Sequence, residues 1–136
     1  MTKNYYLNLK YSLRAFCVSL DTTLRWYIDA INETPTESVF AIVKTSTDAV
    51  EDETLPYTDD MINLNVFAKE LANVESTVGT ILQSLSNRNI QVKDYKDGTL
   101  TLLDTLGIKS VNVEDIGEME GYYQKNISIY FERIGE

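Results

Sequence analysis

The chain has no histidine and only one cysteine, and both shortages restrict its chemistry. Histidine is the commonest general base and the commonest metal ligand, so its absence excludes catalysis and metal sites built on imidazole. The single cysteine, Cys17, excludes an intrachain disulfide. Because Cys17 lies at helical spacing from Leu13 and Leu20, we interpret it as a small side chain of the core. These shortages argue against most hydrolases.

Basic residues are outnumbered: 12 Lys and Arg stand against 21 Asp and Glu, for a formal net charge of −9. The imbalance is greatest in residues 32–60, which hold eight acids and one base, Lys44. Such a charge repels phosphate backbones and anionic membranes, so we expect no specific binding to either. No apolar run approaches the ~20 residues that span a bilayer, and the N-terminal residues lack the apolar core of a secretory signal. We therefore expect a protein that is kept in the cytoplasm, or that assembles there.

What the chain does contain is a succession of two hydrophobic periods. Apolar residues alternate in residues 61–67, recur at helical spacing through residues 71–85, and alternate again in residues 122–134. Periods of 2, then 3.6, then 2 predict a sheet with a helix laid across it. With 136 residues, 43% hydrophobic and 24% charged, we expect one α+β domain, residues 1–136, with a mixed, mainly antiparallel β-sheet and helices packed on it.

The first half of the chain predicts three further elements. Residues 1–34 are predicted to be a helical lead, in one or two pieces, because apolar residues recur there every three or four positions. Asp21 is placed to cap a second piece, and Pro35 ends the helix because the residue before proline resists the α region. Residues 39–43 are predicted to be a strand covered on both faces. Residues 46–60 are predicted to be an acidic loop, whose length is typical of a functional segment.

Turn and cap signals divide the second half. Asn73 is expected to cap the helix that follows it, and Arg88-Asn89 to close that helix. Asp97-Gly98 predicts a hairpin turn between two short strands. Gly107 is expected to break the chain again, and Gly117–Gly121 to form an acidic turn before the final strand.

Carboxylates are the only candidate chemical groups that cluster. The dense groups are Glu51-Asp52-Glu53 and Asp59-Asp60. Carboxylates bind calcium and magnesium, but these acids lack the spacing of an EF-hand, and we interpret them as a solvated loop. The chain contains no glycine-rich phosphate loop, Cys/His metal spacing or nucleophile elbow. We therefore expect no catalytic residues, no metal site and no cofactor.

Tyrosine is the aromatic residue in excess, with nine copies against four phenylalanines and one tryptophan. Its apolar ring and polar tip suit contact surfaces as well as half-buried strands, and both interpretations stay open. Together with the long acidic loop, the tyrosines favour a protein–protein assembly piece over an enzyme.

Four segments match the pattern of a known family: Ile62–Ala68, the helix Val74–Leu85, the short hairpin near Asp97-Gly98, and the ending Tyr122–Arg133. Over residues 38–136 the chain resembles the tail terminator or neck (tail completion) proteins of tailed bacteriophages. The match is a pattern of elements and not a set of invariant chemical residues.

The resemblance implies a structural role without catalysis. Proteins of this family form a hexameric ring that caps the head-proximal end of the tail tube, stops the addition of tube subunits and offers a docking face to the head. The implied partners are further copies of this chain, the tail tube protein and a head-closure or connector protein. The genome passes through the ring without specific binding. The implied location is the tail or neck region of the virion, after assembly in the host cytoplasm.

On this interpretation the contact residues lie mainly in the acidic loop, with weaker candidates on the final strand. The predicted contact residues are Asp48, Glu51, Asp52, Glu53, Tyr57, Asp59, Asp60, Tyr122, Tyr123 and Arg133. An acidic rim facing the channel would repel genome phosphates during passage.

Two alternatives stay open. The first is another virion protein, either a head-completion or adaptor protein or a tail-tube subunit; a tube subunit polymerises into long tubes, whereas a terminator stays monomeric or forms single rings. The second is a small cytoplasmic enzyme or ligand-binding module that uses carboxylates and tyrosines. Its melting temperature would rise with a metal or metabolite, because a ligand that binds only the native state stabilises that state.

Overall fold

The computed structural model describes residues 5–28, 35–46 and 61–133. Within these ranges the chain forms two helices and six strands, in the order α1 (Tyr5–Leu20), β1 (Arg25–Ile28), β2 (Val39–Ser46), β3 (Met61–Ala68), α2 (Leu71–Leu85), β4 (Ile90–Lys93), β5 (Leu102–Met119) and β6 (Tyr122–Arg133). The strands form one sheet in the order β1-β2-β3-β6-β5-β4, in which β1 and β2 run parallel and the other neighbours antiparallel. The predicted α+β fold, a mainly antiparallel sheet with helices packed on it, is confirmed.

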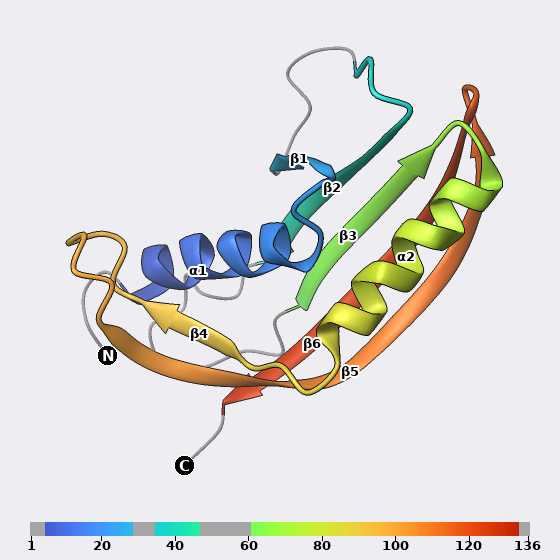
Figure 1. Cartoon of the computed structure of the whole chain (residues 1–136). Coiled ribbons are helices and arrows are strands. Elements are labelled where there is room, and N and C mark those ends of the chain that lie inside the picture. The colour runs from blue at the N-terminus through green and yellow to red at the C-terminus, as the bar shows by residue number, and fades with distance from the viewer. Residues whose placement is uncertain (1–4, 29–34, 47–60, 134–136) are drawn as a thin grey trace.

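Both helices lie on the same face of the curled sheet, with α2 along β3 and β6 and α1 across β4 and β2 (Figure 1). Strand β3 places alternate side chains under the helices and the others on the opposite face, where they are half-buried. The register extends the covered face to β6, where Leu64 lies opposite Ile127. The core side of α2 consists of Val74, Val78, Ile81 and Leu85. The alternation and the helical spacing predicted for this part of the sequence are confirmed.

The prediction of helix over residues 1–34 is wrong after Leu20 in the part that the structure describes. The carboxylate of Asp21 accepts hydrogen bonds from the backbone N–H and the hydroxyl of Thr23, at 3.1 and 2.7 Å. This contact closes a turn and does not cap a second helix. The chain then enters β1, where Trp26 and Tyr27 are both buried on opposite faces of the sheet. Apolar residues three and four apart also occur in a strand covered on both faces, so the spacing alone could not identify a helix.

The limits of α2 differ from those expected, whereas the following hairpin is confirmed. The N-cap residue is Glu70, so Asn73 lies inside the first turn of the helix instead of capping it. The helix ends at Leu85, before Arg88-Asn89, because the chain must turn into β4. Strands β4 and β5 pair antiparallel across the turn that contains Asp97-Gly98.

Strand β5 is longer than the sequence indicated. Gly107 does not break it, because Gly107 pairs with Glu132 and the pairing with β6 continues, through two register shifts, to Met119. The acidic turn contracts to two residues, Glu120-Gly121, since Met119 already pairs with Tyr122. Both turn residues have positive φ, 53° and 85°, as a two-residue hairpin turn of this hand requires. Residues 107–119, in which a break and an acidic turn were expected, therefore belong to one strand.

Cys17 is a buried core residue, as predicted. Burial raises the pKa of its thiol, because the charged thiolate would lose its hydration. The thiolate is the reactive form, so we expect the native protein to resist iodoacetamide and to react only after unfolding. Mass spectrometry after treatment in buffer and in urea measures this difference. Rapid modification in buffer would contradict the packing described here.

Candidate functional site

The predicted contact residues fall into two groups. The loop residues Asp48, Glu51, Asp52, Glu53, Tyr57, Asp59 and Asp60 lie outside the described residues. The others belong to β6: Arg133 ends the strand with its backbone opposite Leu106, and its side chain is not among those described. Tyr122 and Tyr123 begin the strand. Because successive strand residues point to opposite faces, these two tyrosines do not form one surface.

Tyr122 and Tyr123 have different surroundings. Tyr123 packs half-buried against the core on the helix side. Tyr122 joins an aromatic cluster on the open face of the sheet, with its ring centroid 5.3 Å from that of Phe40. Phe40 also stacks on Phe67 at 4.9 Å and meets Tyr27 edge-on at 5.7 Å. This cluster buries Phe40 on the face away from the helices, as the prediction of a strand covered on both faces requires.

A long free edge is the most unusual surface in the described residues. Strand β4 pairs only with the beginning of β5, from Leu102 to Leu106. Residues 107–119 of β5 pair with β6 on one side, and no described strand lies on the other side. Unpaired backbone N–H and C=O groups along such an edge are a template for pairing with another chain.

Exposed apolar side chains accompany the free edge. Val111 and Val113 are 37% and 40% exposed, although the register places them opposite Ile129 and Ile127, which are fully buried. The difference arises because α2 covers β3 and β6 but not β5 (Figure 1). Met119, at the end of the strand, is 62% exposed. Apolar groups beside an open strand edge are typical of a protein–protein contact.

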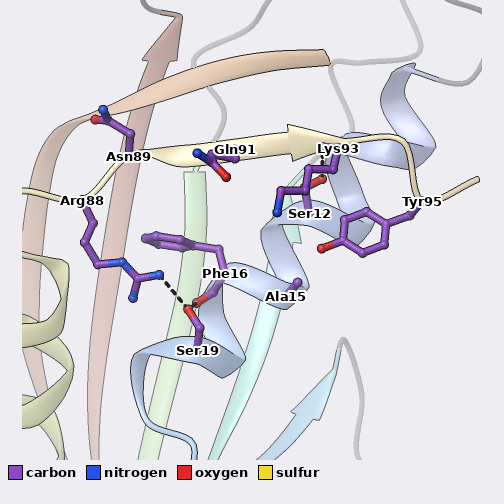
Figure 2. A pocket seen from close by; sticks show the side chains of 9 residues that line it. All are labelled: Ser12, Ala15, Phe16, Ser19, Arg88, Asn89, Gln91, Lys93 and Tyr95. Carbon is purple, nitrogen blue, oxygen red and sulfur yellow. Dashed lines mark hydrogen bonds between the residues drawn. The ribbon is translucent and has the colours of Figure 1, made fainter. Parts of the chain in front are cut away.

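The second candidate surface is a hollow of about 390 Å³ between α1 and β4. Figure 2 shows its lining: Ser12, Ala15, Phe16, Ser19, Arg88, Asn89, Gln91, Lys93 and Tyr95. The backbone N–H of Lys93 donates to the hydroxyl of Ser12 at 3.0 Å, which attaches β4 to the helix. Nearby, the buried Asn8 accepts a hydrogen bond from the backbone N–H of Lys96 at 2.8 Å. Side chains of α1 thus bind the edge of β4.

Arg88 forms one wall of the hollow. Its Nη2 donates to the hydroxyl of Ser19 at 3.0 Å, and its guanidinium lies 4.9 Å from the ring centroid of Phe16. Lys93 is the second basic residue, and none of the nine lining residues is acidic. The hollow is therefore a locally basic surface in a chain of net charge −9. A carboxylate is the natural partner of such a surface.

Sequence patterns did not reveal either surface. A β-bulge at Lys109 shifts the register between Ile108 and Ser110, so the apolar alternation changes phase there and Val111 and Val113 stand out as an isolated pair. The hollow joins residues about 80 positions apart, such as Ser12 and Lys93. The one available signal was polar Asn8 and Ser12 on the buried side of α1.

Three further findings bear on function. The described residues contain no group of three or more Cys, Asp or Glu side chains placed to hold a metal ion. Among the described residues, no helix is long and apolar enough to cross a membrane. No family model and no curated protein matches the sequence.

Proposed function

We propose that this chain is a tail terminator of a tailed bacteriophage: a ring-forming virion protein without catalytic activity. In this role it ends polymerisation of the tail tube at the head-proximal end and joins the tail to the head. The observation that carries the proposal is the free edge of β5, whose open backbone and exposed valines suit contact with another protein chain.

The resemblance supports the more specific part of the proposal. The segments that match the terminator or neck pattern are β3, α2, the β4–β5 hairpin and β6. Three of them, β3, α2 and β6, form the centre of the fold and share a buried core. A rigid centre of this kind keeps the surrounding contact surfaces in fixed positions, which a closed ring of subunits requires.

The proposed partners are further copies of the chain, the tail tube protein and the head-closure or connector protein. The proposed location is the neck of the virion, after assembly in the host cytoplasm. A net charge of −9 limits adhesion of the genome as it passes through the ring, because like charges repel.

A second candidate uses the same edge differently. A tail-tube subunit would pair along β5 in an open-ended series, and a head-completion or adaptor protein would pair with the head. The free edge suits all three roles, whereas the resemblance favours the terminator.

Electron microscopy of the purified protein with isolated tail tubes tests the proposal. We expect a single ring at one end of each tube and no further tube growth after it binds. Tubes without added protein, and tubes with an unrelated acidic protein of similar size, are the controls. Long polymers of the protein alone would identify a tube subunit, and an absence of binding to tube ends would overturn the terminator proposal.

A further inference from the structure

The described part of the molecule carries two complementary surfaces at its opposite ends. Figure 1 places the turn between β5 and β6 at one end of the curled sheet, and α1 with β4 at the other. The first end is acidic and projects, and the second contains the basic hollow between α1 and β4.

The projecting end, residues 114–121, is called here the hairpin tip. Its shape is fixed by the two-residue turn, in which Glu120 and Gly121 both have positive φ. Its exposed charged side chains are all carboxylates: Glu114, Asp115, Glu118 and Glu120. Ile116 and Met119 add apolar groups that are 42% and 62% exposed. The hairpin tip therefore combines negative charge with apolar side chains on a paired β-hairpin.

The hollow offers the matching chemistry. Arg88 and Lys93 supply positive charge, and Phe16 and Tyr95 supply ring surface. Lys93 directs its backbone N–H away from β5, toward Ser12. Gln91 lies two residues earlier, so its backbone N–H also points away from β5, because backbone groups alternate in direction along a strand. One wall of the hollow is thus the edge of β4, which Ser12 already occupies at Lys93, so docking there depends on the side chains of the hollow.

We propose that the hairpin tip of one copy docks into the hollow of the next copy. This inference rests on the proposed function, since it identifies the contact by which copies of the chain form a ring. A second copy is the favoured occupant because the same chain supplies both the acidic projection and the basic recess. The contact joins two different surfaces, so it is heterologous, and a series of such contacts closes into a ring when the rotation between copies allows it.

Reversing one charge on each surface tests the docking. Lys93→Glu replaces one of the two positive charges of the hollow by a negative charge, and Glu118→Lys replaces one of the four carboxylates of the hairpin tip by a positive charge. When positions 118 and 93 meet in the contact, each variant alone places two like charges together there, so we expect its self-association to weaken at least roughly tenfold. In an equimolar mixture every contact pairs opposite charges again, provided that the two variants alternate around the ring. We expect the mixture to recover assembly, with an even number of copies.

Sedimentation velocity over a range of concentrations, with electron microscopy of the larger species, measures assembly. Lys44→Glu on β2 and Glu132→Lys on β6 are matched controls, because both residues are exposed outside the two surfaces; both should assemble like the wild type. Thermal melting of every variant shows that the fold is kept. Normal assembly of either single variant, or failure of the mixture to assemble, overturns the docking while wild-type rings leave the proposed function standing. Wild-type protein that stays monomeric alone and forms no ring on tail tubes overturns both.

Discussion

Proline in place of Val113 is expected to weaken assembly of the chain at least roughly tenfold while leaving the fold intact. Met119 and Tyr122 close a two-residue turn and so form a hydrogen-bonded pair. Backbone N–H groups point to alternate sides along β5, and Ile116 is one extra residue in the pairing with β6. Counted back from Met119, the N–H of Asn112 therefore points toward β6 and that of Val113 toward the free edge. Proline removes only a group that faces away from the sheet, and edge strands tolerate it in that position.

Two control variants separate the backbone effect from other causes. Val113→Ala removes the same apolar side chain but keeps the N–H, so it should weaken assembly less than proline does. Asn112→Pro removes an N–H that faces β6, so it should destabilise the hairpin itself. Sedimentation velocity measures assembly, and thermal melting measures stability. Assembly of Val113→Pro at wild-type concentrations would show that the free edge of β5 is not a contact.

Replacing Leu64 by alanine is expected to lower the free energy of unfolding by about 2–5 kcal/mol. Leu64 is fully buried in the middle of β3, between Val43 of β2 and Ile127 of β6, and beneath the helices. Truncation removes apolar contacts and leaves a cavity that the surrounding sheet cannot easily fill. The corresponding fall in Tm is on the order of 10 °C.

Urea denaturation followed by circular dichroism measures this loss. Leu82→Ala is the matched control, because Leu82 belongs to α2 but is 37% exposed; its effect should stay within about 0.5 kcal/mol. If the two substitutions cost the same, the core does not lie where α2 meets β3 and β6.

Sequence patterns predicted the elements that have one covered face. Strand β3 and helix α2 each bury one side, so their periods of 2 and 3.6 appear directly in the sequence. Strand β1 buries Trp26 on one face and Tyr27 on the other, so its sequence shows no alternation between apolar and polar residues. In β5 the bulge at Lys109 interrupts the alternation of apolar residues, and Gly107 suggests the end of a strand although the strand continues through it.

The candidate site was harder to predict than the fold. Whether a strand has a neighbour on each side depends on the order of the whole sheet, which local periods do not contain. The hollow depends on contacts such as that of Arg88 with Ser19, 69 residues apart. Tyr122 and Tyr123 were both predicted as contact residues, but the environment of each depends on which face of the sheet it occupies.

The described sheet has unequal sides. β1 ends one side with four residues, and on the other side the amides of β4 at Lys93 and of Lys96 just beyond it are occupied by Ser12 and Asn8 of α1. Only β5 presents an extended stretch of open backbone among the described strands. Continued growth of a sheet by strand addition needs an open strand on both sides of every molecule, so the described sheet can accept one added chain along β5 but offers no matching open strand at its other side for a further one.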